Sequence, residues 1–338
     1  MAGNAYLVAN GYLGFIAEVT RGTTPSTGTV FYVPVTSPQV SPMQTFLDDG
    51  ALRGSPVALY DQVQGVRHDE FDHKSFLYAD TFPVYAKALL GGTDTVTTTS
   101  SSYSHSIPLL NSASTGSQPL SYSICNFDGA NWFTMANSQA ASLAISGGAD
   151  AAAEATLKWI SNPYSSATSA PAPFTSLSTS GEHLIPAWNS TITLAGSGIS
   201  YVESFDLLID RKTAPIFTDG TQAPYANFAG PIEVSGKFTC VVASNADPFS
   251  TGATGYALTR NPQTLTITLT DPNDVHSAIN DSISFQMSQV QFENVKRTQS
   301  KQYLSLDVEF HAEANSTDAA SGFSPVKITT VNGISAAF

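Results

Sequence analysis

The stretch Thr264-Leu265-Thr266-Ile267-Thr268-Leu269-Thr270 carries an apolar side chain at every second position. Successive side chains of an extended chain point to opposite faces, so Leu265, Ile267 and Leu269 share one face and the threonines share the other. β-branched residues also favour extended backbone. This stretch therefore predicts a strand that covers a core on one face and meets solvent or a partner on the other.

Similar stretches recur along most of the chain. They are short and rich in β-branched and aromatic residues, and several alternate in polarity, which is typical of half-buried strands. Their repetition indicates a mainly β protein. The predicted strands are Gly11–Val19, Thr29–Val35, Gly65–Phe71, Leu120–Asn126, Ser142–Ser146, Thr191–Leu194, Tyr201–Ile209, Glu233–Val242, Thr264–Thr270, Ser282–Val290 and Tyr303–Phe310.

One helix is predicted between these strands. Asp80 or Thr81 can cap its start, and Pro83 suits the first turn. Val84–Leu90 contains good helix formers, and Gly91–Gly92 predicts its end. The segment Asp150–Trp159 is rich in alanine but surrounded by strands, so it can be a helix or a strand.

Three segments are predicted to be long loops because they lack apolar periodicity. Thr36–Pro56 carries prolines and glycine, Thr93–Ser106 is mostly serine and threonine, and Ser161–Ser180 is a linker of serine, threonine, proline and alanine. Loops of more than about 15 residues are uncommon in compact domains unless they have a function or pack on a neighbour. We therefore expect these loops to contact partners.

Composition excludes several classes of protein. Only 12% of the 338 residues are charged and the formal net charge is −13, whereas nucleic-acid binders normally present a basic face. The first residues contain no Lys or Arg before Arg21, unlike a secretory signal, and no segment has the apolar length of a membrane helix. Cys125 and Cys240 fit buried thiols, with a disulfide between them as the alternative.

The two sides of the serine-rich linker contain features in the same order. Gly65 leads a strand that ends before Ala79-Asp80-Thr81-Phe82, and Gly230, 165 residues later (230 − 65), leads a strand that ends before Ala246-Asp247-Pro248-Phe249. Downstream, Asn137-Ser138-Gln139 is similar to Met287-Ser288-Gln289 at a spacing of 150 (288 − 138). We interpret this order as a duplication, with one domain in residues 1–175, a second in 181–338, and a linker in 161–180.

The side chains best suited to bind a cation or take part in catalysis lie in one strand. Alternation places His68, Glu70 and Asp72 on one face, where they form either a lumen-facing surface or a weak cation site. A strand supplies no preformed cage, so we expect no metal centre there. The acidic stretches Asp48-Asp49-Gly50 and Asp271–Asp274 read as turns. No catalytic signature is present, so we expect neither an enzyme nor a cofactor.

The order of these features resembles the major tail tube proteins of long-tailed bacteriophages. The likeness is carried by Gly14–Thr23, Asp61–Gly65, Thr81-Phe82-Pro83 with Leu89-Leu90-Gly91, Tyr103–Pro108, Ser121–Ile124 and Pro325–Thr330. The resemblance implies a β-sandwich or open barrel with one flanking helix. It also implies rings that stack into a tube, through which DNA leaves the virion. Two tandem tube-like domains would then make the ring a trimer with pseudo-sixfold symmetry, in place of a hexamer.

The same resemblance implies partners and contact residues. The partners are further copies of the chain, the tape-measure protein, the tail terminator, and distal tail or baseplate proteins. DNA passes without specific binding, and no membrane is entered. The Thr36–Pro56 loop is expected to reach an adjacent ring, and Arg211–Gly230 is its counterpart. The expected inter-ring contacts are Met43, Phe46, Leu47, Asp48, Asp49, Arg53, Ile216 and Phe217.

Two further expectations complete this interpretation. A lumen of net negative charge would keep DNA from adhering, and assembly would take place in the host cytoplasm before the protein enters the virion tail. The alternative is a carbohydrate-binding β-sandwich of a phage fibre or surface adhesin. That alternative predicts solvent-exposed aromatic side chains in a groove.

Overall fold

The computed structural model describes residues 7–51, 53–99, 102–112, 116–175, 183–199, 201–242, 260–276, 279–299 and 302–338. Within these residues the chain is mainly β, with one α-helix, α1 (Phe82–Leu90), and two short 3-10 turns, η1 (Val8–Asn10) and η2 (Ala187–Asn189). Nearly all strands join one extended antiparallel sheet, and β14 (Ala214–Ile216) and β15 (Ala226–Phe228) form a separate pair. The mainly β prediction is confirmed.

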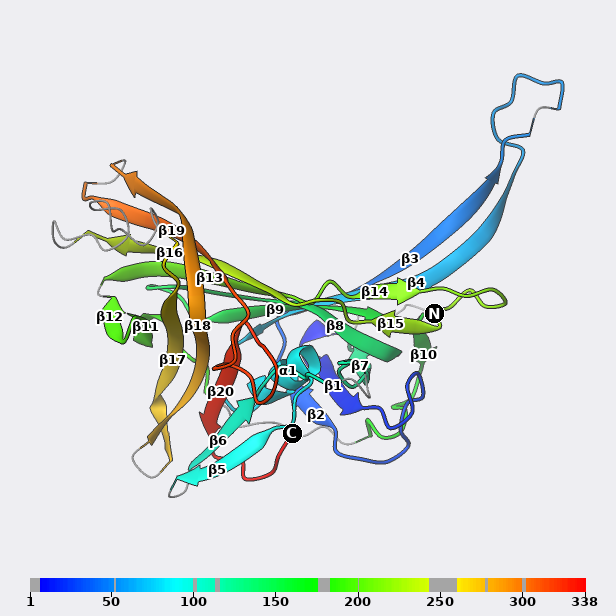
Figure 1. The fold of residues 1–338 in the computed structure, drawn as a ribbon. Helices are drawn as coiled ribbons and strands as arrows, with labels where there is room; N and C mark the ends of the chain where they lie inside the picture. The colour runs from blue at the N-terminus through cyan, green and yellow to red at the C-terminus, as the bar shows by residue number, and fades with distance from the viewer. Residues whose placement is uncertain are drawn as a thin grey trace.

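Eight strands form a continuous row that we call the main sheet (Figure 1). Each strand pairs antiparallel with the next. The order is β3 (Ser37–Asp49), β4 (Asp61–Phe76), β9 (Glu154–Ser161), β8 (Trp132–Gly148), β13 (Val202–Asp210), β16 (Glu233–Val241), β19 (Ser305–Ala312) and β18 (Ile279–Thr298). The first four come from the first half of the chain, and the last four come from the second half.

The long strands β8 and β18 each continue from the main sheet into a second group of strands. The first part of β8 pairs with β7 (Tyr122–Phe127) and β10 (Ser165–Ala167), and β7 leads to β1 (Tyr12–Ala17) and β2 (Phe31–Val33). The first part of β18 pairs with β17 (Gln263–His276) and β20 (Lys327–Asn332), and β17 leads to β11 (Ser190–Leu194) and β12 (Ser197–Ile199). A hairpin of β5 (Thr95–Thr99) and β6 (Ser102–Ile107) adds to β20.

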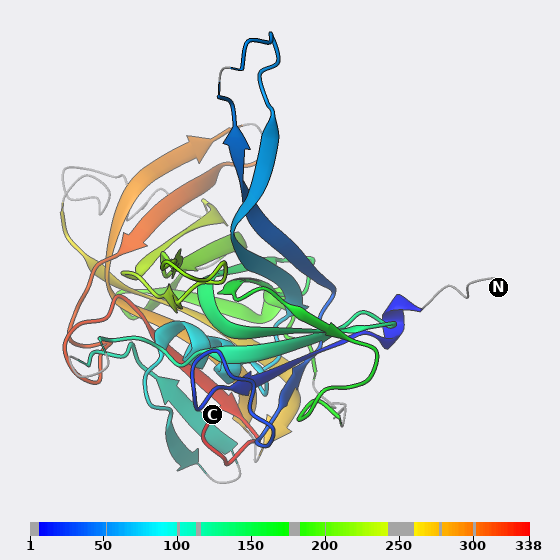
Figure 2. The ribbon, with the colours of Figure 1, turned by 90° about the vertical axis from the view of Figure 1, so that its right-hand side faces the viewer.

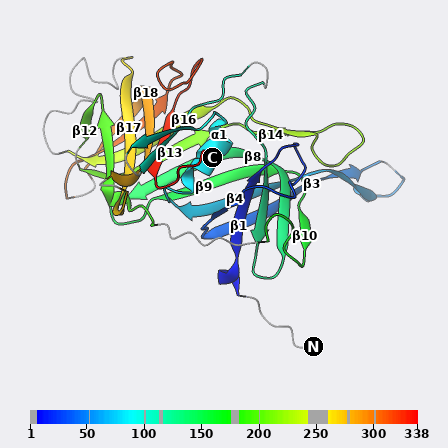
Figure 3. The ribbon, with the colours of Figure 1, turned by 90° about the horizontal axis from the view of Figure 1, so that it is seen from below.

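The two halves therefore repeat one pairing scheme. The strands β1, β2, β3, β4, β7, β8, β9 and β10 correspond in order to β11, β12, β13, β16, β17, β18, β19 and β20. Each of the seven pairings within the first set has an antiparallel equivalent in the second. Figure 3 shows the β1–β10 group and the β17–β18 group at opposite ends of the molecule, with α1 between them.

Helix α1 lies inside the molecule, against β8, β6 and β20 (Figure 2). All of its residues except Lys87 are buried, and Phe82 packs edge-on against Phe285 with ring centroids 5.6 Å apart. Gly91 ends the helix in the left-handed region at φ 77°, which a glycine adopts without strain. The predicted helix is confirmed, and it is enclosed by strands from both halves.

Alternation correctly predicts which side chains form the core. Leu265, Ile267 and Leu269 are fully buried, and the threonines between them are half-buried or exposed. The segment Asp150–Trp159, which the sequence leaves open, contains the start of β9 and no helix. Cys125 and Cys240 are buried thiols, as expected, and neither is disulfide-bonded.

Two predicted loops are wrong. Thr36–Pro56 contains β3, which pairs along its length with β4, and Thr93–Ser106 contains the β5–β6 hairpin. Both were missed because their strands show little alternation of burial: most of β3 is exposed, and β5 is built from threonine with one valine. Ser161 ends β9 and β10 lies within the predicted linker, while residues 176–180 of that linker fall outside the described residues.

Asp271–Asp274 is not a turn between strands. It lies within β17 at an irregularity of the β17–β18 pairing, and the Asp271 carboxylate accepts a hydrogen bond from the Asn273 N–H at 2.8 Å. The repeat element Ala246–Phe249 and the nearby segment 245–255 lie outside the described residues.

Candidate assembly surfaces

The most prominent surface is an arm formed by the outer parts of β3 and β4, which extends well away from the rest of the molecule (Figure 1). We define the arm as residues 44–67. Its pairing contains an irregularity between Gln44 and Phe46, near the place where it leaves the main sheet. Large apolar side chains on it are 47–63% exposed, which is unusual for a surface that never meets a partner. They are Phe46, Leu47, Val57, Leu59 and Val63.

Polar contacts order the tip of the arm. Asp49 forms an ion pair with Arg53, whose guanidinium lies 4.9 Å from the centre of the Tyr60 ring. The Gln62 amide donates to the Asp48 carboxylate at 2.8 Å. Asp48, Asp49 and Arg53 thus hold the tip in shape, and the arm presents a formed surface.

The second predicted contact segment lies beside the arm. The Phe217 ring is 5.9 Å from the His68 ring, and the Arg67 N–H donates to the Gln222 carbonyl at 2.8 Å. The side chain of Ile216 in β14 is 41% exposed. The structure therefore brings the Arg211–Gly230 segment to the base of the arm.

Exposed aromatic side chains in this region were not predicted. Tyr225, which directly precedes β15, is 74% exposed, and Phe228, at the end of β15, is 46% exposed. Met43, which was predicted as a contact, lies at the base of the arm and is 43% exposed. The sequence does not predict Val57, Leu59 and Val63 as contact residues, because no regular apolar pattern surrounds them. The apolar Val63 in a polar stretch is nevertheless a signal of a contact surface.

His68, Glu70 and Asp72 share the solvent side of β4, as alternation predicts, whereas Asp69, Phe71 and His73 are buried. His68 Nε2 lies 3.9 Å from Glu70 Oε1. Burial raises the pKa of Asp72, Glu70 raises it further, and Lys158 opposes both. Among the residues that the structure describes, no three His, Cys, Asp or Glu side chains are grouped to hold a metal ion.

The buried face of β4 contains a charged pair and a neutral histidine. Asp69 accepts a hydrogen bond from the Tyr164 N–H at 2.6 Å and lies 3.7 Å from Arg67; burial raises its pKa despite both partners. His73 bonds to the Tyr85 hydroxyl at 3.1 Å, and burial lowers its pKa to about 3. His73 is therefore uncharged at neutral pH and packs as part of the core.

The solvent face of the main sheet carries more negative than positive charge. The strand registers, the burial alternation and the ion pairs place nine carboxylates and five lysines on this face; they include Glu293, which pairs with His311, and Lys212, which pairs with Asp210 and Glu233. The other carboxylates are Glu70, Asp72, Glu154, Asp206, Asp210, Glu233, Asp307 and Glu309, and the other lysines are Lys74, Lys158, Lys237 and Lys296. Some are paired, as Lys237 is with Asp206 at 3.4 Å. This face repels polyanions.

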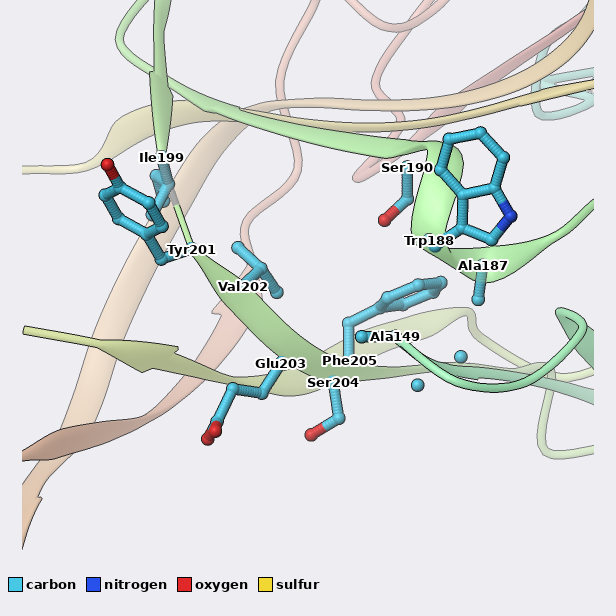
Figure 4. A pocket seen from close by; sticks show the side chains of 12 residues that line it. Ala149, Ala187, Trp188, Ser190, Ile199, Tyr201, Val202, Glu203, Ser204 and Phe205 are labelled. Atoms are coloured by element: carbon cyan, nitrogen blue, oxygen red, sulfur yellow. The ribbon is translucent and has the colours of Figure 1, made fainter. Parts of the chain in front are cut away.

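A pocket lies at the end of the β8–β13 pair that is remote from the arm (Figure 4). Gly147, Phe205 and Glu203 line it, and Trp188 and Tyr201 stand at opposite sides of it. Trp188 is 62% exposed and Tyr201 is 66% exposed. The molecule thus exposes apolar side chains at both ends of the main sheet.

Both outer edges of the main sheet are open within the described residues. β3 pairs with β4 alone, and β18 beyond Phe292 pairs with β19 alone. Unpaired edges favour pairing with another chain. Pro38 and Pro42 lie in β3, where proline is tolerated because it needs no ladder hydrogen bond on an open edge.

Comparison with known proteins identifies the family of the chain. No curated protein matches the sequence. Within the described residues, no helix is long and apolar enough to cross a membrane. A family model described as phage tail tube protein matches residues 8–312, which covers nearly the whole chain. The chain therefore belongs to the phage tail tube protein family and is a structural component of the virion tail.

Proposed function

We propose that each chain supplies two tube-like units, and that three chains close into a ring with pseudo-sixfold symmetry. The units correspond to residues 1–175 and 181–338, joined by the segment 161–180. The observation that carries this proposal is the repeated pairing scheme of the two halves. A chance resemblance between β proteins would not reproduce seven pairings in the same order.

The irregularities of the two halves also coincide. Between β7 and β8 the register shifts as Tyr122 pairs with Ser138 and Ile124 with Met135. Between β17 and β18 it shifts as Gln263 pairs with Val290 and Leu265 with Met287. In each case one strand advances by two residues and its partner by three. β-bulges are features that families retain, so their coincidence supports a duplication.

The registers also bear on the spacing of the repeat. In the first half, Glu70, Ile160 and Gln139 lie opposite one another on the adjacent strands β4, β9 and β8. In the second half, Ser235, His311 and Gln291 lie opposite one another on β16, β19 and β18. Glu70 and Ser235 are 165 residues apart (235 − 70), the spacing that the glycines indicate. For β8 and β18 the spacing is 152 (291 − 139), two residues more than the sequence comparison indicates.

The arm and the opposite end of the main sheet are the proposed stacking surfaces. Each chain has one long arm, while the equivalent part of the second unit is the shorter β14–β15 segment. Head-to-tail contacts require two different complementary surfaces. The exposed apolar side chains of the arm, with Ile216 and Phe217 at its base, are proposed to meet the end of the next ring near Trp188 and Tyr201.

The negatively charged face of the main sheet is the proposed lumen wall. It would enclose the tape-measure protein during assembly and later let DNA pass without specific binding. The tail terminator and the distal tail or baseplate proteins would contact the two ends of the tube. Assembly would take place in the host cytoplasm, without insertion into a membrane and without catalysis.

The family match favours this function over a carbohydrate-binding module. Trp188 and Tyr201 are exposed beside a pocket, but they stand on opposite sides of it and do not form one stacking platform (Figure 4). Contact with an adjacent ring is the simpler role for them.

Negative-stain electron microscopy of the purified protein over a range of concentrations tests the proposal. We expect rings and hollow tubes whose end-on views show threefold symmetry with six similar lobes. True sixfold symmetry with six chains per ring would contradict the three-chain ring. A small particle that never polymerises at any concentration would contradict the assembly function.

A further inference from the structure

His105, a buried residue of β6, has hydrogen-bond partners that can only accept. Its Nδ1 lies 2.8 Å from Asp94 Oδ2. Its Nε2 lies 2.8 Å from the Ile334 carbonyl oxygen and 3.1 Å from Asn332 Oδ1. The Asn332 amide nitrogen donates to the Ala79 carbonyl at 3.0 Å, which turns its oxygen toward His105. Because neither an ionised carboxylate nor a carbonyl donates a proton, both ring nitrogens donate, and the His105 ring is a positively charged imidazolium.

The charge of His105 is opposite to what burial alone produces. His73 is also buried and bonds to the Tyr85 hydroxyl, and burial lowers its pKa to about 3. Burial lowers the pKa of His105 too, but the hydrogen bonds to Asp94 and to the two carbonyl oxygens outweigh burial, and this pKa lies above its ordinary value. The carboxylate of Asp94 thus stabilises a buried cation.

The same network holds residues 333–338, which we call the latch segment, at a second point. The Phe338 N–H donates to Asp94 Oδ2 at 3.1 Å, and the Phe338 carbonyl accepts from Lys87 Nζ at 2.8 Å. Ile334 and Phe338 are half-buried, whereas the residues between them are exposed. The latch segment contains no helix or strand, so these two anchors fix its position.

The Phe338 ring covers the network. Its centroid lies 5.1 Å from the His105 ring, edge-on, and 5.3 Å from the Phe31 ring of β2. Figure 1 shows this end of the chain beside α1 and β2. His105 is 1% exposed and Asp94 is 6% exposed. The latch segment therefore shields the network from water, and the network in turn holds the latch segment.

We propose that the His105 imidazolium is a proton-dependent latch, which holds the latch segment in place and releases it when Nε2 gives its proton to the solvent. Nδ1 keeps its proton because it faces the Asp94 carboxylate. The neutral Nε2 then turns a lone pair toward the Ile334 carbonyl oxygen, so an attractive contact becomes a repulsive one. Release uncovers the rings of Phe31 and Phe338, which changes the surface that the subunit presents beside β2.

The groups around the ring set the direction of the pH dependence. Asp94 is the carboxylate bonded to the ring, and neither β5 nor the latch segment carries a titratable side chain. The other elements packed here contribute Lys87 on α1, Asp80 before α1, Tyr103 on β6, Lys327 on β20 and Tyr32 on β2. The pKa of His105 is raised above 6.5 in the folded chain, so its contribution to stability is complete below that pH. The contribution is lost as pH rises through the folded-state pKa.

Hydrogen exchange measured by mass spectrometry on the full chain tests the latch. The protection of the peptide that contains the latch segment is measured from about pH 6 to about pH 10 and corrected for the intrinsic exchange rate at each pH. We expect the protection of this peptide to fall at least about tenfold as pH rises, while a peptide from β17 keeps its protection. The inference is independent of the proposed ring, because it concerns a contact within one chain.

Four variants separate the contributions of the charged groups. His105→Gln keeps an amide donor but does not titrate, so its protection should not change over this pH range. Asp94→Asn weakens proton binding by the ring and should move the pH step to a lower pH. Burial lowers the pKa of Lys87, so Lys87→Gln removes a second group that titrates, and it should keep the step. His311→Gln is the matched control, because His311 is a surface residue paired with Glu293.

Imidazole ¹⁵N spectra of the wild type provide a readout that does not depend on the folding of any variant. We expect one ring that keeps both N–H protons above the pH at which ordinary histidines are neutral. Absence of such a ring would overturn the latch. Constant protection of the latch segment in the wild type, or a His105→Gln protein with the same pH step as the wild type, would also overturn it.

Discussion

At the scale of the residue, His73 makes the fold sensitive to acid. Its folded-state pKa of about 3 lies below the ordinary value of 6.5, because the ring is buried. Between these values the unfolded chain binds a proton that the folded chain does not, so stability falls as pH falls below about 6.5. At pH 5 the loss is about 2 kcal/mol, and His73→Gln removes it. Thermal unfolding at pH 7 and pH 5 measures the difference.

His68→Gln is the matched control, since His68 lies on the same strand but faces solvent. We expect its acid sensitivity to equal that of the wild type. A His73→Gln protein whose melting temperature falls with acid as much as the wild type would show that His73 does not control this behaviour.

A second residue-scale prediction concerns Glu18, a buried carboxylate at the end of β1. It accepts hydrogen bonds of 2.7–2.8 Å from the hydroxyls of Ser121 and Ser123 and from the N–H groups of Gly22 and Asn137. Glu18→Ala leaves the buried donors of Ser121 and Asn137 without their acceptor, at about 1–3 kcal/mol each. We expect the largest melting-temperature decrease of any single carboxylate removal, against a negligible change for the exposed Glu70→Ala.

At the same scale, the sequence identified core residues well and surface contacts less well. Alternation predicts Leu265, Ile267 and Leu269 as core, and it correctly separates His68 and Glu70 from the buried side of β4. It gives no warning of Trp188 or Tyr201, because an exposed aromatic residue has the same sequence signal as a buried one. Tertiary packing decides whether such an aromatic side chain is buried or exposed.

At the scale of the element, the arm is the part whose removal should separate ring formation from stacking. Ser37–Met43 must stay, because it is the main-sheet part of β3; deletion of the whole Thr36–Pro56 segment would remove a strand. Removal of residues 46–63, with an Asn-Gly turn in their place, keeps this base. We expect rings of normal size that no longer form tubes, as judged by electron microscopy.

A milder variant checks that apolar contact is the cause. Phe46→Ser with Leu47→Ser keeps the hairpin and its Asp49–Arg53 ion pair, so polymerisation should require a concentration at least several-fold higher. Normal tubes from the shortened protein would exclude the arm as the bridge between rings.

The sequence predicts a strand where one face of the strand is buried. It does not predict a strand whose two faces are both exposed. The sequence of β3 predicts a loop because its proline, serine and glutamine residues lie mostly in solvent on both sides. β8 and β18 were predicted too short for a related reason. Each continues between two groups of strands, so its pattern of burial changes part of the way along. No local rule detects a strand that serves two sheets.

At the scale of the whole molecule, the charge of the main-sheet face should govern contact with DNA. Assembled wild-type tubes should not retain duplex DNA at about 0.15 M salt, since nine carboxylates oppose five lysines on that face. Glu70→Lys replaces a negative charge with a positive one, which raises the net charge of the face by about two per chain, and should increase retention at low salt. Asp219→Lys, in the loop between β14 and β15, is the control of equal charge.

Equal retention by the Glu70→Lys and Asp219→Lys tubes would argue that the main-sheet face does not line the lumen. The proposed duplication is visible in the sequence only as an order of features, because few residues coincide between the halves. The strand pairings indicate the repeat, whereas the side chains do not. Phe71 on β4 corresponds to Gly236 on β16, and His73 corresponds to Phe238.

The β8–β13 junction lowers the dependence of assembly on the concentration of the chain. In the proposed ring, every second seam is already made when the polypeptide folds, so it forms at an effective concentration that dilution cannot alter. Closing a ring then needs three encounters where single-unit chains would need six, and the rate of nucleation depends on a lower power of the chain concentration. Covalent linkage also fixes the alternation of long-armed and short-armed units, so two long arms can never be neighbours around a ring.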